Sequence, residues 1–241
     1  MGCTFCASTL TGLTRNLTAG EMLSQIYQIQ KDTKERVSNI IVMGMGEPLD
    51  NYEELLRFIK LVSCEKGIGI SQRNITVSTC GLVDKIRMLA DEKLQITLAI
   101  SLHAPNDEIR RQTMPIANRY TIGEIIQACK YYFDKTGRRI TFEYSMIRGV
   151  NDKEEHAKEL AGRLSGLNCH INLIPLNEVK ERNCYRSTKE DIEKFKTILE
   201  KFKSTLAKYH INATIRKSMG SDIDAACGQL RKKFLTKNGR N

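Results

Sequence analysis

The feature that most constrains the fold is an alternation between short apolar runs and amphipathic stretches. The apolar runs have strand length and cover residues 39–44, 74–81, 95–103, 139–147, 168–177 and 211–218. The amphipathic stretches between or after them have helix length and cover residues 52–64, 83–93, 121–137, 151–166 and 187–209. Alternating strands and helices form parallel sheets, and continuous apolar runs are typical of strands covered by helices.

The glycine pattern decides between two parallel architectures. A nucleotide-binding open sheet carries a Gly-x-Gly-x-x-Gly or Walker loop after a strand, whereas "GMGEPL" (44–49) lacks the third glycine. The sequence therefore favours an α/β barrel, full or partial. With 241 residues and no linker or low-complexity tract, we expect one domain over residues 1–241.

The charge balance indicates an anionic partner. The formal net charge is +10, and the pI is near 9.2. Nucleic acid is favoured over a membrane surface, although a generally solvated basic surface would give the same balance. The pairs Arg110–Arg111 and Arg138–Arg139 and the segment 231–240 are either solvated charge or phosphate contacts. No apolar run reaches the length of a membrane span, and no secretory signal is recognisable, so we expect a cytoplasmic protein without membrane contact.

Polar residues stand where several predicted strands end. In parallel architectures the chemistry gathers at this edge, so these residues should share one pocket. Glu47 either caps the following helix or binds the ammonium of an amino-acid ligand. His103 is either a hydrogen-bonded loop histidine or a ligand-binding residue. The strand-end residues are Gly46, Glu47, Ser78, Ser101, Leu102, His103, Tyr144–Met146, Pro175, Leu176 and Asn177.

Two of the eight cysteines, Cys3 and Cys6, are closely spaced. A structural zinc site needs a second pair, and a thioredoxin-type pair should follow a strand. The spacing also fits the end of a Cys-x3-Cys-x2-Cys motif, whose three thiolates hold a 4Fe-4S cluster with one iron left open. Zinc, a cluster and an unliganded pair all remain open. The other cysteines are interpreted mainly as buried apolar residues, including Cys227, which stands in the polar segment 220–228.

Eight motifs together resemble one known family, the radical S-adenosylmethionine (radical-SAM) methyltransferases of adenine in RNA, the RlmN/Cfr group. The resemblance runs from about residue 2 to residue 233. "STCG" and "CAST" depart mildly from the family pattern. The motifs, in the family's order, are "GCTFCA", "TRNLTAGEM", "VMGMGEPLDNY", "ITVSTCG", "AISLHAPND", "RRITFEYSMIRGVND", "HINLIPLN" and "DIDAACGQLR".

The resemblance implies a role for each matching position. Cys3 and Cys6 would be two of three ligands of a 4Fe-4S cluster, and Cys227 would be the methyl-carrying catalytic cysteine. The SAM site would comprise Gly46, Glu47, Ser78, Ser101, Leu102, His103 and Asn177. The fold would be a partial (β/α)6 radical-SAM barrel. Its first strand, the third cluster cysteine, the releasing cysteine, the base and an accessory domain are expected upstream of Met1.

The implied activity is methylation of carbon 2 of an adenine in 23S rRNA, and of tRNA as well, by a monomer that receives electrons from a flavodoxin or ferredoxin. Three alternatives remain at this point. The first is the relative that methylates carbon 8 and confers antibiotic resistance. The second is a non-catalytic RNA-binding remnant, and the third is a zinc-binding structural domain.

Overall fold

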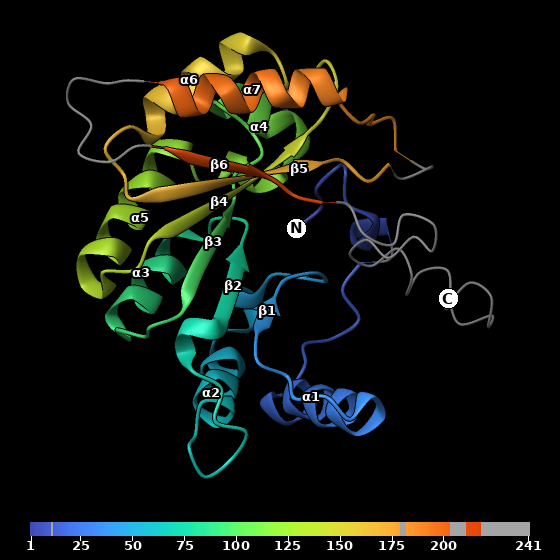
Figure 1. Ribbon diagram of the computed structural model, residues 1–241, viewed down its shortest axis with the longest axis vertical. Coiled ribbons are helices and arrows are strands. Elements are labelled where there is room, and N and C mark those ends of the chain that lie inside the picture. Colours follow the sequence, from blue (N-terminus) through green and yellow to red (C-terminus); the bar gives the residue numbers. More distant parts are fainter. Residues whose placement is uncertain (11, 179–181, 203–210, 218–241) are drawn as a thin grey trace.

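The computed structural model describes residues 1–241 except residues 11, 179–181, 203–210 and 218–241. In this part of the chain, six parallel strands form one sheet in the order β1-β2-β3-β4-β5-β6 (Figure 1). Each strand therefore pairs with the next one along the chain. Their bounds are Ile40–Val42 (β1), Ile75–Thr79 (β2), Thr97–Ser101 (β3), Ile140–Met146 (β4), Cys169–Pro175 (β5) and Asn212–Ile215 (β6).

Helices connect the strands, and several of them begin at a residue whose side chain caps the helix. The side chain of Thr18 caps α1 in a capping box with Glu21, and Thr121 and Glu124 do the same for α5. The α-helices are α1 (Ala19–Thr33), α2 (Tyr52–Val62), α3 (Val83–Asp91), α4 (Asp107–Thr113), α5 (Ile122–Thr136), α6 (Glu154–Leu164) and α7 (Lys189–Lys201). Short 3-10 helices are η1 (Ala7–Leu10), η2 (Pro48–Asn51), η3 (Gln72–Asn74) and η4 (Pro115–Asn118).

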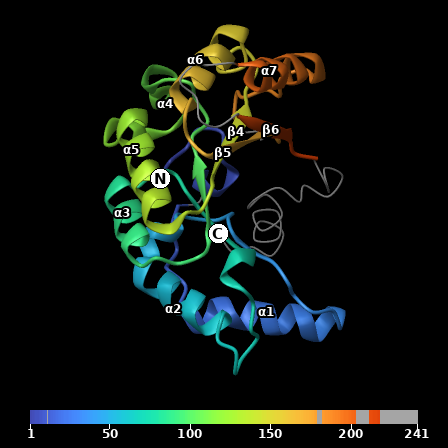
Figure 2. The same cartoon turned by 60° about the vertical axis from the view of Figure 1, so that its left-hand side comes forward.

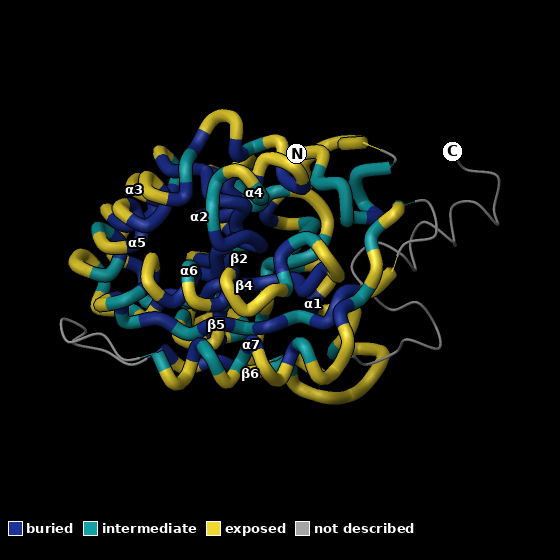
Figure 3. Tube along the Cα trace, turned by 90° about the horizontal axis from the view of Figure 1, so that it is seen from above, coloured by how far each residue is buried: buried dark blue, intermediate teal, exposed yellow. Residues whose placement is uncertain are grey.

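The helices form an arc around the outer face of the curved sheet, and the N-terminal segment lies on the inner side (Figure 2). Apolar side chains of the strands enter the core between sheet and helices. In β4, for example, Phe142 and Tyr144 are buried in that core, and the Tyr144 ring packs against Phe195 of α7. From above, the strands form the buried centre, and the outer turns of the helices are exposed (Figure 3).

The inner face of the sheet is polar. Side chains alternate between the two faces of a strand, and the residues that alternate with the buried apolar ones are polar. Glu143 of β4 lies opposite Ser101 of β3 on one side and Asn172 of β5 on the other. Asn172 in turn lies opposite Thr214 of β6. The interpretation of these strands as uniformly apolar was therefore wrong, since helices cover only the outer face.

The parallel α/β architecture predicted from the sequence is confirmed, and every predicted strand is present but shorter. Two helices, α1 and α4, were not among the predicted helices. No helix in the described residues combines the length and the apolarity that a membrane crossing requires.

Candidate active site at the carboxyl edge of the sheet

The two N-terminal cysteines form one tight turn. The backbone N–H of Cys6 donates to the carbonyl of Cys3 at 3.3 Å, and the hydroxyl of Thr9 bridges both cysteine carbonyls at 3.0 and 2.9 Å. Arg182, from the segment after β5, donates to that hydroxyl at 3.0 Å. Residues 1–10, which we call the cysteine turn, are thus held by a residue that lies 173 positions after Thr9 in the chain.

The cysteine turn lies at the edge of the sheet where the strands end, the carboxyl edge. The backbone N–H of Thr4 donates to the carbonyl of Thr113 at 2.9 Å. The thiol of Cys80, directly after β2, contacts the sulfur of Met1 at 3.6 Å. The structure therefore brings the cysteine pair close to the strand ends, a neighbourhood that the sequence alone did not predict.

Partial burial keeps the Cys3 thiol protonated. Burial, followed by the neighbouring Cys6, raises the pKa of Cys3 to about 11, and the positive charges of the N-terminal amine and then of Arg110 oppose this shift. A metal that binds this sulfur must therefore displace a proton. A nearby cation lowers the free-energy cost of that step.

Glu47 joins the β1 loop to the end of β2. One carboxylate oxygen accepts from the backbone N–H of Leu49 at 3.1 Å, and the other accepts from that of Cys80 at 2.7 Å. The capping role considered for Glu47 is confirmed, and binding of a ligand ammonium stays a prediction. Gly46 precedes Glu47 with φ +88°, a left-handed conformation that favours glycine.

Two predicted serines meet on the inner face of the sheet. The hydroxyls of Ser78 on β2 and Ser101 on β3 lie 3.4 Å apart. Leu102 follows Ser101 and is fully buried, and its carbonyl accepts from Nε of Arg110 at 3.2 Å. The Leu102 N–H donates to the carbonyl of Glu143 at 3.1 Å, which continues the pairing of β3 with β4.

His103 is buried in a strained backbone conformation. Its φ is +55°, which is uncommon for a residue with a side chain, and such strain concentrates at functional sites. Its Nδ1 accepts from the backbone N–H of Ser145 at 2.9 Å, so the proton of the neutral ring is on Nε2. Burial, assisted by the charge of Arg110, lowers the pKa of His103 to about 3. The ring is therefore a neutral donor at physiological pH.

The remaining predicted residues are placed less closely. Asn177 follows β5 at the carboxyl edge and is exposed. Tyr144 faces α7 and donates its hydroxyl to the carbonyl of Asn151 at 2.7 Å, so it belongs to the core. Cys227, the predicted catalytic cysteine, lies outside the described residues.

Sequence reasoning missed Glu143, a carboxylate that is 5% exposed on the inner face of β4. The amide of Asn172 donates to it at 2.9 Å, and burial raises its pKa above the ordinary value. The alternation of polar residues at positions 141, 143 and 145 was the available signal.

Sequence reasoning also misplaced two arginines. Arg110 is fully buried, so its assignment to solvated charge or phosphate contact was wrong. Arg138 donates to the carbonyl of Ile96 and to the hydroxyl of Thr97, at the opposite edge where strands begin. Among the isolated cysteines, Cys80, Cys129 and Cys169 are buried as predicted, whereas Cys64 is exposed and Cys184 is half-buried.

The donor chemistry of the cysteine turn fits an iron–sulfur cluster, because thiolates are the ligands such clusters prefer. Cys3 and Cys6 supply two of those ligands on one turn. The described residues offer no group of three cysteine, histidine or acidic side chains that could hold a metal ion. The turn therefore provides part of a cluster site.

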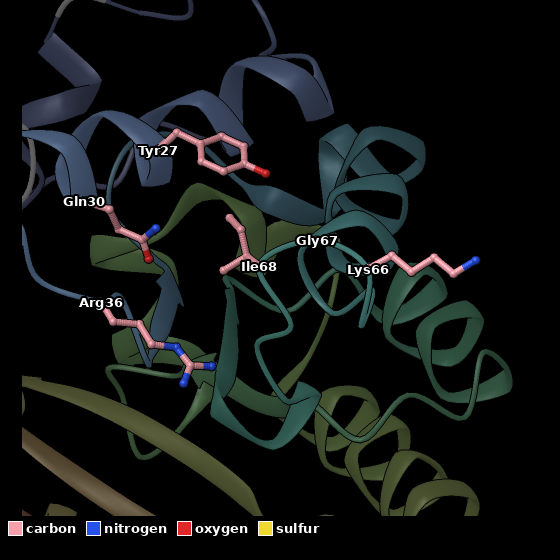
Figure 4. Close-up of a pocket in the computed structure, with 6 residues that line it drawn as sticks. All are labelled: Tyr27, Gln30, Arg36, Lys66, Gly67 and Ile68. Carbon is pink, nitrogen blue, oxygen red and sulfur yellow. The ribbon is translucent and has the colours of Figure 1, made fainter.

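A pocket of about 450 Å³ lies elsewhere, between α1 and the segment that follows α2 (Figure 4). It is near the edge where the strands begin, so it is separate from the cysteine turn. Tyr27, Arg36 and Ile68 point toward its centre, while Lys66 points away. The lining residues are Tyr27, Gln30, Arg36, Lys66, Gly67 and Ile68.

Comparisons with known proteins agree with this geometry. The family model of the radical SAM superfamily matches residues 1–161. A probable dual-specificity RNA methyltransferase RlmN from Lachnospira eligens is 60% identical over 98% of this chain and 65% of its own length. One from Clostridium novyi is 56% identical over 99% of this chain and 67% of its own. A radical SAM methyltransferase from Sphaerobacter thermophilus superposes with a TM-score of 0.87 and 48% identity, covering 95% of this chain and 66% of that one.

A cysteine turn at the carboxyl edge of a curved parallel sheet, with a matching family model, defines the class as radical-SAM proteins. The chain belongs to the radical SAM superfamily and, within it, to the RlmN methyltransferases. It spans about 65% of the length of the first of these curated relatives.

Proposed function

We propose that this chain is the radical-SAM part of an enzyme that methylates carbon 2 of an adenine in 23S rRNA and in tRNA. The observation that carries this proposal is the identity of 56–60% to proteins named as dual-specificity RNA methyltransferases, over nearly the whole chain. The net charge of +10 suits a polyanionic substrate.

The residues at the carboxyl edge suit S-adenosylmethionine and a 4Fe-4S cluster. Cys3 and Cys6 would ligate the cluster. Glu47, anchored by two backbone N–H groups, would accept the ammonium of the methionine part, and Gly46 would let the backbone approach it. When bound, the cluster supplies the electron that cleaves SAM to a carbon-centred radical.

The strand ends would orient the rest of the cofactor. The paired hydroxyls of Ser78 and Ser101 and the Nε2–H of His103 offer hydrogen-bonding groups that are already fixed by the sheet. Leu102 would contribute backbone and Asn177 its amide. The packing of the cysteine turn over these strand ends would exclude water from a reactive radical.

Cys227 would carry the methyl group. Carbon 2 of adenine lies between two ring nitrogens and is electron-poor, so it does not attack the SAM methyl as a nucleophile. The Cys227 sulfur can take that methyl in a displacement that releases S-adenosylhomocysteine. The methyl bound to sulfur is then the carbon that joins the base.

The proposal also includes the partners of the enzyme. The enzyme would act as a monomer in the cytoplasm, where its RNA substrates are, and would take electrons from a flavodoxin or ferredoxin.

Product analysis tests the function. The longest in-frame product of the gene, reconstituted with iron and sulfide, should convert an adenine-containing 23S rRNA fragment to 2-methyladenine. Detection of 8-methyladenine, or of unmodified RNA alongside intact SAM cleavage, would contradict the carbon-2 assignment.

A further inference from the structure

Glu143 is a carboxylate on the inner face of the sheet that is 5% exposed and only half satisfied. The side-chain amide of Asn172 donates to its Oε2 at 2.9 Å, and no residue in the described part of the chain donates to its Oε1. Buried polar atoms in proteins nearly always have a hydrogen-bond partner. Glu143 therefore keeps one oxygen that can accept from a bound molecule.

Glu143 lies beside the residues predicted to bind SAM. Its carbonyl accepts from the backbone N–H of Leu102 at 3.1 Å and from that of His103 at 3.3 Å. Ser101 lies opposite Glu143 in the register of β3 and β4, and its hydroxyl is 3.4 Å from that of Ser78. A molecule bound on the inner face near the carboxyl edge would therefore meet the two serines and the carboxylate together.

The charge of Glu143 is compensated only in part. Burial raises its pKa, and the hydrogen bond from Asn172, followed by the charge of Arg216, opposes this shift. Among the described residues, no cationic group lies within 4.0 Å of the carboxylate. A ligand that donates to Oε1 would stabilise the ionised form.

The neighbouring polar groups of Glu143 and Asn172 match the edge of an adenine base. An amide nitrogen carries two hydrogens, and Glu143 accepts one of them, so the pair offers an acceptor next to a donor. The exocyclic amine of adenine is a donor flanked by the acceptors N1 and N7. A 6-oxo purine such as hypoxanthine places a carbonyl oxygen at the position of the amine, and that oxygen would be repelled by Oε1.

We propose that Glu143 is a specificity-determining residue that accepts a hydrogen bond from the exocyclic amine of an adenine bound on the inner face of the sheet. The inference rests on the proposed function, which supplies two such bases, the target adenine of the RNA and the adenine of SAM. The two bases carry the same amine, so binding experiments with separate ligands are needed to tell them apart.

Inosine is a suitable probe, because it has a carbonyl in place of the amine. S-adenosylhomocysteine and its inosine analogue test the cofactor base. A uridine oligonucleotide with one central adenosine or inosine tests the substrate base. Dissociation constants are measured for the longest in-frame product of the gene, reconstituted with iron and sulfide. Wild-type protein should bind the adenosine member of one pair at least about tenfold more tightly, the effect of one hydrogen bond to a charged group.

Glu143→Gln should reverse this preference. Asn172 donates to Oε2, so the new amide oxygen should stay at that position and the amide nitrogen should replace Oε1. The variant then presents a donor to the base and should favour the inosine member of the same pair. Glu193→Gln is the matched control, because Glu193 is exposed on α7, and it should leave the preference unchanged.

Reversal in the S-adenosylhomocysteine pair would assign Glu143 to the cofactor base, and reversal in the oligonucleotide pair would assign it to the substrate base. The proposal is overturned if wild type shows no preference for adenosine in either pair. It is also overturned if Glu143→Gln keeps the wild-type preference or weakens both members of a pair equally. The wild-type preference decides alone if the variant does not fold. Formation of 2-methyladenine by wild-type protein tests the proposed function separately from all of these outcomes.

Discussion

The rings of Phe5 and His103 lie edge to face, with their centroids 5.1 Å apart and their planes at 77°. Phe5 stands between the two cysteines of the turn, and His103 follows β3. Their contact joins the two groups of residues that the sequence singled out separately, the cysteine pair and the strand ends. The Thr4–Thr113 hydrogen bond reinforces this junction.

Phe5→Ala should loosen the cysteine turn without unfolding the domain. An edge-to-face pair contributes about 0.5–1.5 kcal/mol beyond its buried area, so amide hydrogen exchange over residues 1–10 should accelerate up to about tenfold. The urea midpoint of the whole domain should change little. Leu13→Ala is the control, because Leu13 is 70% exposed, and it should alter neither measurement. Unchanged exchange in Phe5→Ala would show that the ring contact does not hold the turn.

His103 should make the domain sensitive to acid. Its pKa is about 3 in the folded state, below the ordinary value of about 6.5 that it regains on unfolding. The unfolded state therefore binds the extra proton between these values, and stability should fall as pH drops below about 6.5, by up to about 1.4 kcal/mol per pH unit.

Urea midpoints at pH 7.5, 6.0 and 5.0 measure this effect in wild type and in His103→Asn, since asparagine tolerates a positive φ. The difference between the two proteins should shrink toward low pH. His170→Asn is the control. His170 is only half-buried, and burial lowers its pKa by less than it lowers the pKa of His103. Parallel pH profiles for wild type and His103→Asn would rule out His103 as the source.

Gly81→Ala should be strongly destabilising because two costs coincide. Gly81 has φ +100°, and an added Cβ would lie 2.7 Å from Cδ1 of Ile125 and 3.5 Å from the Arg110 guanidinium. We expect a loss of about 2–4 kcal/mol in the free energy of unfolding. Gly137→Ala is the matched control, with φ +66° and open space around the new Cβ, and should cost about 1 kcal/mol. Equal losses would mean that Ile125 moves aside freely.

The architecture could be predicted from the sequence, because the alternation of apolar runs and amphipathic stretches is typical of a parallel sheet covered by helices. The sequence was also sufficient to bring Glu47, Ser78, Ser101 and His103 to one edge, since strand ends share that edge. It could not separate Arg110 from Arg111, which are adjacent and chemically identical. Only the orientation of α4 over the ends of β2 and β3 buries one and exposes the other.

The polar inner face escaped prediction for a related reason. Short strands such as "ITFEYSM" contain enough apolar residues to be interpreted as buried on both faces. Glu143 is tolerated there because Asn172 on the next strand donates to it. That partner depends on the register between β4 and β5, which the sequence of one strand does not contain.

RNA affinity should depend on salt and on the carboxyl edge. Arg148, in the loop after β4, is exposed at that edge, whereas Arg73, in η3 before β2, is exposed at the opposite edge. Binding of an rRNA fragment should weaken steeply between 50 and about 200 mM salt, as expected for counterion release. Arg148→Gln should reduce the slope of log affinity against log salt by about one, and Arg73→Gln should leave it unchanged. A slope near zero, or equal effects of both variants, would contradict this placement.

Cys227→Ser tests the methyl-carrier role against the alternative of a small buried cysteine. If Cys227 carries the methyl, the serine variant of the longest in-frame product should still assemble its cluster and bind SAM. It should transfer no methyl to RNA, because a serine hydroxyl at neutral pH cannot replace a thiolate nucleophile. Wild-type protein should carry one added methyl on the peptide that contains "AACGQLR" (225–231), and the variant none, as measured by mass spectrometry.

Cys129→Ser is the matched control for that experiment. Cys129 is fully buried in α5, so its replacement should lower the free energy of unfolding by about 1–3 kcal/mol and leave the methylated peptide in place. The two variants should thus behave in opposite ways. Cys227→Ser should lose methyl transfer and keep its fold, whereas Cys129→Ser should lose stability and keep methyl transfer. Clear RNA methylation by Cys227→Ser would return Cys227 to a packing role and remove the main support for transfer through a methylated cysteine.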